Sequence, residues 1–77
     1  MSEDLETIVA RTLGIDRAAV DDRLAREREP AWDSFNHLLL IAEVERAYGI
    51  RFAVDQPAAI HDLPGLRAAV AALTGRP

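Results

Sequence analysis

Chemistry in this sequence centres on one serine near the middle of the chain. Ser34 follows Asp33 and precedes a stretch, residues 35–48, that contains neither glycine nor proline, so the pair stands where a helix is expected to begin. A hydroxyl at that position is exposed and lies at the positive end of the helix dipole, where an attached phosphate would be stabilised. Ser34 is therefore a candidate site for a phosphoester.

A purely structural role for Ser34 is the first alternative. Serine is a common N-cap worth about 1 kcal/mol, because its side chain accepts a hydrogen bond from a free amide of the first turn. The fuller capping box needs glutamate or glutamine three residues later, and position 37 is occupied by His37. Capping alone therefore leaves part of the local pattern unexplained.

Two apolar arcs follow Ser34 on the expected helix. The first has the spacing of a core stripe and contains Leu40, Ile41, Val44 and Tyr48. The second contains Phe35, Leu38, Leu39 and Ala42. A surface helix needs only one such stripe, so the second arc either packs inside a bundle or contacts a partner. Leu39 is the better candidate for an exposed contact.

The rest of the chain predicts three more helices and no strand. Apolar spacing indicates a first helix over residues 3–13 with Ser2 as its cap, and residues 55–60 fit one short helix. Asp62 is the expected cap of a last helix that carries Pro64 in its first turn. The apolar stripe of that last helix contains Leu63, Leu66, Val70 and Leu73. Four helices around one core is the simplest architecture.

Residues 15–32 lack a sustained apolar period and are expected to form a long connection. Ile15, Val20 and Leu24 should attach this segment to the core. The mixed charges of residues 23–29 indicate a solvated loop or a single helical turn.

The composition of the chain limits which kinds of partner and which cellular compartment are expected. The chain has no cysteine, so its fold must rest on packing without disulfides. A net charge of -4 disfavours nucleic acids and anionic membranes, both of which need a basic surface. The acidic N-terminus lacks the pattern of a secretory signal, and we expect the protein in the cytoplasm.

A catalytic or metal-binding function lacks its parts in this sequence. There is no Gly-x-Ser-x-Gly elbow, and His37 and His61 would have to meet Ser34 and an acid in a chain too short for a substrate pocket. The two histidines share no metal-ligand spacing. His37 lies one turn from Ser34 and is expected to be a solvated surface histidine, with contact to an attached group or a partner as the alternative.

The stretch WDSFNHLLLIAEVERAYGIRF, residues 32–52, resembles the Asp-Ser-Leu helix of acyl carrier proteins. Asp33 and Ser34 match that motif, Phe35 stands in the position of its leucine, and Glu45 matches a glutamate common late in the helix. The Tyr-Gly-Ile ending at residues 48–50 matches as well. The Ile-His-Asp-Leu stretch at residues 60–63 resembles the entry to the last helix of that family.

This resemblance implies a single carrier domain over residues 1–77. It would be an all-α, four-helix bundle like that of acyl carrier proteins, with a long loop between helices one and two and a short third helix. Ser34 would receive 4'-phosphopantetheine from coenzyme A, and Asp33 would help to position the phosphopantetheinyl transferase and its metal-bound coenzyme A. The partner-binding residues would be Phe35, Leu38, Leu39 and Ala42.

The implied partners are the transferase, a loading enzyme that is either an adenylating enzyme or an acyltransferase, and downstream synthase or transferase enzymes. The carrier itself would be a monomer. Fatty-acid carriers place acidic residues along this helix, whereas this sequence has Asn36, Leu39 and Arg46 at such positions. The resemblance therefore favours a specialised polyketide or nonribosomal peptide pathway. The alternative is an unmodified helical adaptor in which the apolar face docks a partner and Ser34 is only a cap.

Overall fold

The computed structural model describes residues 4–75, which contain four α-helices and one short 3-10 helix. In chain order these elements are α1 (Leu5–Leu13), η1 (Arg17–Ala19), α2 (Ser34–Tyr48), α3 (Gln56–Ala59) and α4 (Leu63–Thr74). The described part forms no strand, and its one β-bridge joins Ala25 and Asp62. The all-α prediction is confirmed at this level, as are the short helix before Ile60 and the helix that follows Asp62.

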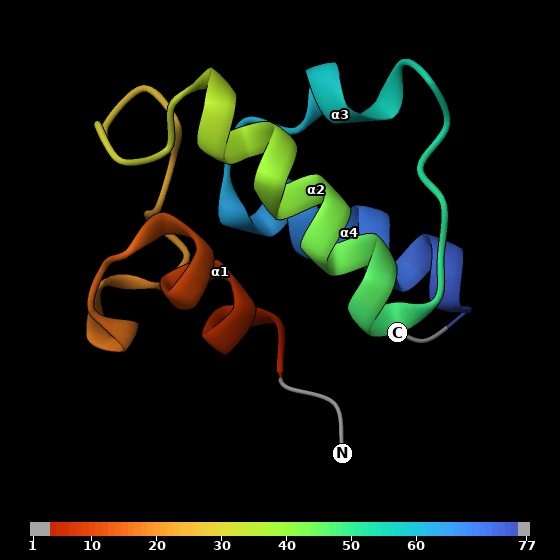
Figure 1. The fold of residues 1–77 in the computed structure, drawn as a ribbon, viewed down its shortest axis with the longest axis horizontal. Coiled ribbons are helices and arrows are strands. Elements are labelled where there is room, and N and C mark those ends of the chain that lie inside the picture. Colours follow the sequence, from red (N-terminus) through yellow and green to blue (C-terminus); the bar gives the residue numbers. More distant parts are fainter. Residues whose placement is uncertain (1–3, 76–77) are drawn as a thin grey trace.

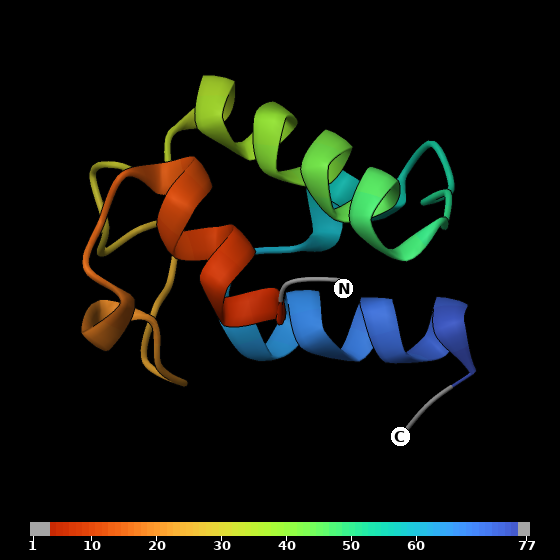
Figure 2. The ribbon, with the colours of Figure 1, turned by 60° about the horizontal axis from the view of Figure 1, so that its bottom comes forward.

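The three longer helices pack with α1 opposed to the other two. α2 and α4 run in the same direction and α1 runs the opposite way, as both views of the ribbon show (Figures 1 and 2). α1 lies against α2, and the segment between them, residues 14–33, covers one end of the molecule. None of the helices within residues 4–75 has the length and apolar character needed to cross a bilayer.

Each longer helix begins at an aspartate cap. The Oδ1 atoms of Asp4, Asp33 and Asp62 accept hydrogen bonds of 2.8 Å from the amide three residues later. The first helix therefore starts at Leu5, two residues later than expected, because Asp4 caps it. The cap expected at Ser2 lies outside the described residues. A carboxylate satisfies one free amide of the first turn and also interacts favourably with the helix dipole.

The first turn of α4 explains an unusual Pro-Gly pair. Pro64 lies at a position where the missing amide hydrogen is not needed by the helix. A Cβ atom added to Gly65 would lie 2.9 Å from Oδ1 of Asp62. Glycine therefore leaves room for the cap that starts the helix.

One apolar core joins α1, α2 and α4 with the segment before α2 and with Ile60, the residue that follows α3. Its residues are buried below a tenth of their surface and are Leu5, Ile8, Val9, Ala10, Leu13, Val20, Leu24, Trp32, Leu40, Ile41, Val44, Ile60, Leu63, Leu66 and Val70. The predicted core stripe of α2 is confirmed for Leu40, Ile41 and Val44, and Tyr48 packs against the core while half-buried. The stripe expected on the last helix is wrong at Leu73, which is 38% exposed. Leu73 lies near the end of α4, which Figure 2 shows beyond the end of α1, so α1 does not cover it.

The segment before α2 is fastened to the linker between α3 and α4. Val20 and Leu24 are buried as expected, and Ile15 packs against the core. The Arg26 amide donates to the His61 carbonyl at 2.8 Å, and the Leu63 amide donates to the Leu24 carbonyl at 3.0 Å. The charged run 23–29 forms turns that are partly exposed, in keeping with the expected solvated loop.

Candidate functional site

Ser34 is the first residue of α2 and its side chain is exposed. The cap of this helix is Asp33, whose Oδ1 accepts from the Asn36 amide at 2.8 Å. The interpretation of Ser34 as the helix cap is therefore wrong, because the preceding carboxylate already occupies that position. Within residues 4–75 the exposed Ser34 hydroxyl has no hydrogen-bonding partner.

The backbone that leads into Ser34 is held from both sides. The Asn36 side-chain amide donates to the Ala31 carbonyl at 2.8 Å, and the Trp32 amide donates to the Glu29 carbonyl at 2.9 Å. Trp32 itself is 1% exposed and belongs to the core. These contacts fix the turn before the helix, and with it the backbone position of Ser34.

His37 is buried, so the expectation of a solvated surface histidine is wrong. Its side chain is 5% exposed, its Nδ1 lies 2.9 Å from the Nε1 of Trp32, and its Nε2 lies 2.7 Å from the carbonyl oxygen of Pro57. Because the indole nitrogen can only donate, Nδ1 must accept and Nε2 must carry the proton. His37 is therefore a neutral bridge between the turn before α2 and the short helix α3.

Burial lowers the pKa of His37, and the positive charge of Arg26 and the nearby His61 act in the same direction. The carbonyl of Pro57 acts in the opposite direction and does not outweigh the burial. Protonation at Nδ1 would place two donors against each other at Trp32. The bridge thus persists only in the neutral form.

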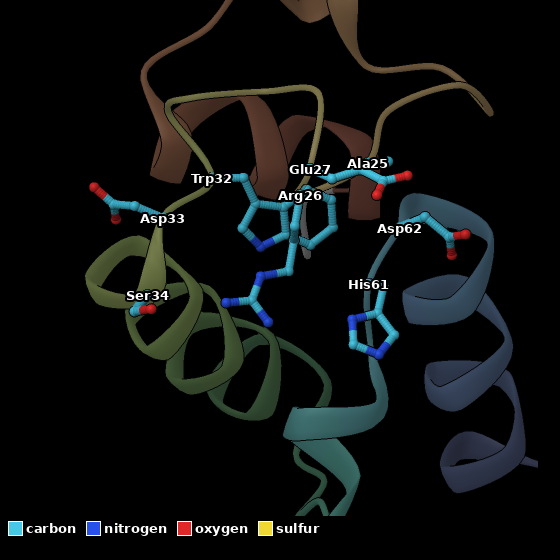
Figure 3. A pocket seen from close by; sticks show the side chains of 8 residues that line it. All are labelled: Ala25, Arg26, Glu27, Trp32, Asp33, Ser34, His61 and Asp62. Carbon is cyan, nitrogen blue, oxygen red and sulfur yellow. The ribbon is translucent and has the colours of Figure 1, made fainter.

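A pocket of about 500 Å³ opens beside Ser34. It lies between the turn that carries Trp32, Asp33 and Ser34, the segment 25–27, and the linker residues His61 and Asp62 (Figure 3). These walls come from parts of the chain that are far apart in sequence. The backbone bonds between residues 24–26 and 61–63 hold the two far walls together.

The second apolar arc of α2 is exposed. Phe35 is 69% exposed, Leu38 66% and Leu39 43%, and Ala42 is exposed as well. The arc is therefore not buried in the bundle. Leu39 is exposed, as expected, but it is the least exposed of the three large residues, so Phe35 and Leu38 are the better candidates for a contact with a partner. Val54, in the connection between α2 and α3, is also fully exposed. A contiguous helix face of this kind is typical of a contact surface.

Two residues of this site were missed from the sequence. Trp32, directly before the Asp33 cap, is buried in the core, and Arg26 is half-buried and lines the pocket. A signal for His37 did exist, since it lies three residues before Leu40 and four before Ile41, on the same arc as the core stripe. For Arg26 the sequence offered no such signal, because its surroundings depend on the linker between α3 and α4, residues 60–62.

No family model matches the chain, and no curated protein matches it. Within residues 4–75 no group of three or more His, Cys, Asp or Glu side chains is placed to hold a metal ion. The case for a function therefore rests on the geometry around Ser34.

Proposed function

We propose that this protein is an acyl carrier protein that bears 4'-phosphopantetheine on Ser34. The observation that carries the proposal is an exposed serine hydroxyl at the first position of a capped helix, on the edge of an open pocket. The free amides and the dipole of the first turn favour a negative group at that position. A modifying enzyme can reach Ser34 without unfolding any element.

The order of helices supports the same proposal. A carrier of this class would have three longer helices, a long connection between the first two and a short third helix. α1, α2 and α4 with the segment 14–33 and the four-residue α3 are compatible with that plan.

Attachment would form one bond and break one. The Ser34 oxygen bonds to the phosphorus next to the pantetheine, the pyrophosphate bond of coenzyme A breaks, adenosine 3',5'-bisphosphate leaves, and the hydroxyl proton passes to a base of the transferase. The residues present fit the group, because Ser34 supplies the hydroxyl, Arg26 a nearby cation, and the pocket room for the arm. Once attached, the arm supplies a terminal thiol that holds an acyl or aminoacyl group as a thioester.

The exposed arc of α2 supports a role in docking. Phe35, Leu38, Leu39 and Ala42 lie within two turns of Ser34, so an enzyme seated on them would have the arm close at hand. A tether works by raising the local concentration of its cargo, which needs a bound partner near the attachment point. We propose the transferase, a loading enzyme and downstream synthase or transferase enzymes as these partners.

Asn36, Leu39 and Arg46 stand at positions where a fatty-acid carrier would have acidic residues, which supports a specialised polyketide or nonribosomal peptide pathway. The proposed carrier would act as a monomer in the cytoplasm. The same exposed arc also favours a second candidate, an unmodified adaptor that docks a partner through α2. The adaptor has no need of Ser34.

Intact mass separates the two candidates. The purified chain is incubated with coenzyme A and a broad-specificity phosphopantetheinyl transferase, alongside Ser34→Ala. We expect the wild type to gain the mass of one phosphopantetheine and Ser34→Ala to gain nothing. No gain on a wild-type chain shown to be folded by circular dichroism would overturn the carrier and leave the adaptor.

A further inference from the structure

Arg26 differs from the other arginines of this protein. It is the only arginine within residues 4–75 that is half-buried, while the others described are exposed. It lines the pocket beside Ser34, and Figure 3 shows its guanidinium reaching into the space between the first turn of α2 and His61. In the part of the chain that the structure describes, no carboxylate lies within ion-pair distance of it. A half-buried cation without a counter-ion is poised to bind an anion.

The position of Arg26 is set by its backbone. Its amide donates to the His61 carbonyl at 2.8 Å, and the neighbouring bond from the Leu63 amide to the Leu24 carbonyl holds the same strip of chain. The side chain therefore starts from a fixed point on the pocket wall. Arg28, two residues later, is exposed and does not line this pocket.

The acidic residues around the pocket do not neutralise Arg26. Asp33 and Asp62 accept hydrogen bonds from the first-turn amides of α2 and α4. Glu27 is exposed, and its carboxylate lies on the side of the pocket away from Ser34 (Figure 3). The pocket thus keeps an unneutralised cation on the side that faces the serine.

On the basis of the proposed function, we infer that Arg26 binds the phosphate that modification places on Ser34 and thereby directs the first atoms of the arm into this pocket. A guanidinium matches a phosphate group well, because its planar N–H donors can engage two oxygens at once. The arm would then leave Ser34 toward the linker between α3 and α4, residues 60–62, instead of straight into solvent. Arg26 acts here as a positioning residue for the arm.

The first test does not depend on any transferase. Phosphoserine is encoded at position 34, and the second ionisation of its phosphate is followed by ³¹P NMR in chains that carry Arg26, Arg26→Gln or Arg28→Gln. The ordinary value for that ionisation is a pKa of about 6, and a nearby cation lowers it by favouring the dianion. We expect the pKa with Arg26 to be lower than with Arg26→Gln by about half a unit or more, and Arg28→Gln to resemble the parent. The helix amides are common to all three chains, so the difference reports Arg26 alone.

Equal phosphate pKa values in the parent and a folded Arg26→Gln chain would overturn the inference. The second test uses the modified protein and follows the Nε–Hε resonance of Arg26, which should shift between the unmodified and modified chains, while that of Arg28 should not. If Ser34 is modified and the Arg26 resonance stays in place, the inference fails and the carrier proposal stands. If the phosphoserine chains show the expected difference but no transferase modifies Ser34, phosphate recognition stands and the carrier proposal fails.

Discussion

α2 and α4 begin in the same way, each after an aspartate whose Oδ1 accepts a 2.8 Å hydrogen bond from the amide three residues later. The first residue of each helix then differs in kind and in burial. Ser34 is exposed at the start of α2, whereas Leu63 is 0% exposed at the start of α4. Both starts also border the same pocket. The aspartate cap therefore marks where each helix begins, while the type of the next residue determines whether the first turn packs into the core or faces solvent.

The largest difference between the two starts should appear in stability. Leu63→Ala removes a fully buried side chain and is expected to lower the free energy of unfolding by about 2–5 kcal/mol. Ser34→Ala removes an exposed hydroxyl without a partner and should change it by less than about 0.5 kcal/mol. Urea denaturation of the two variants measures both values. A Ser34→Ala chain as unstable as Leu63→Ala would contradict the assignment of Ser34 to the surface.

His37, one turn after Ser34, is buried and links α2 to Trp32 and to Pro57 of α3. Its replacement by glutamine should lower the free energy of unfolding by about 1–3 kcal/mol, because the buried indole N–H of Trp32 loses its acceptor. The unfolded chain has the ordinary histidine pKa of 6.5 and the folded chain a lower one, so the unfolded state binds more protons in between. The stability that His37 contributes is therefore full above pH 6.5 and is lost as pH falls through the folded value.

Urea denaturation between pH 5 and pH 8 checks this sign. The wild type should lose stability relative to His37→Gln as pH falls below 6.5, and taking the difference between the two chains cancels every contribution that they share. A difference that grows toward low pH would mean that His37 is protonated in the folded protein.

Replacing the caps of α2 and α4 should have a smaller effect on stability than replacing Leu63 or His37. Asp62→Ala and Asp33→Ala should each lower the free energy of unfolding by about 1 kcal/mol, because each leaves a first-turn amide without an acceptor. Asp33→Asn keeps an oxygen acceptor and should remain within a few tenths of a kcal/mol of the wild type. If Asp33 also helps to position the transferase, Asp33→Asn should slow modification of Ser34 at unchanged stability. Equal modification rates would restrict Asp33 to capping.

The smallest expected effect lies on the exposed arc of α2. Leu38→Ser should change the free energy of unfolding by less than about 0.5 kcal/mol, because the leucine is already 66% exposed. Leu66→Ser, at a fully buried position of α4, serves as the matched control and should unfold much of the population. A large loss of stability at Leu38 would show that the arc packs against the protein itself.

Helix ends and core stripes could be predicted from the sequence because their causes are local. An aspartate before an apolar run and a glycine after it act within one turn, so the bounds of α2 and α4 follow from the residues at each end. Gly49, for example, ends α2 with a φ of 65° and donates its amide to the Glu45 carbonyl. The apolar period in turn selected Leu40 and Val44 as core residues.

The surroundings of the site depend on contacts between distant parts of the chain, and these could not be predicted. His37 lies on the arc of the core stripe, but its two hydrogen-bond partners come from the preceding turn and from α3, twenty residues later, and no local pattern predicts them. Arg26 belongs to a charged run that predicts an exposed side chain. Its amide, however, donates to the His61 carbonyl in the linker between α3 and α4, and Arg26 therefore lines the pocket. The sequence thus placed Ser34 at the start of a helix, while tertiary contacts decide what surrounds it.

The hydrogen bonds between residues 24–26 and 61–63 join two parts of the chain that leave the ribosome at different times during synthesis. A ribosome releases the segment with Ser34 well before it releases His61 and Asp62, so an emerging chain presents the hydroxyl while one wall of the pocket is still missing. The residues that start and end α2, its aspartate cap and its terminal glycine, lie within residues 33–49 and have left the ribosome by then. An enzyme that reads only this helix would accept the unfinished chain, whereas one that also reads the pocket would wait for the last helix.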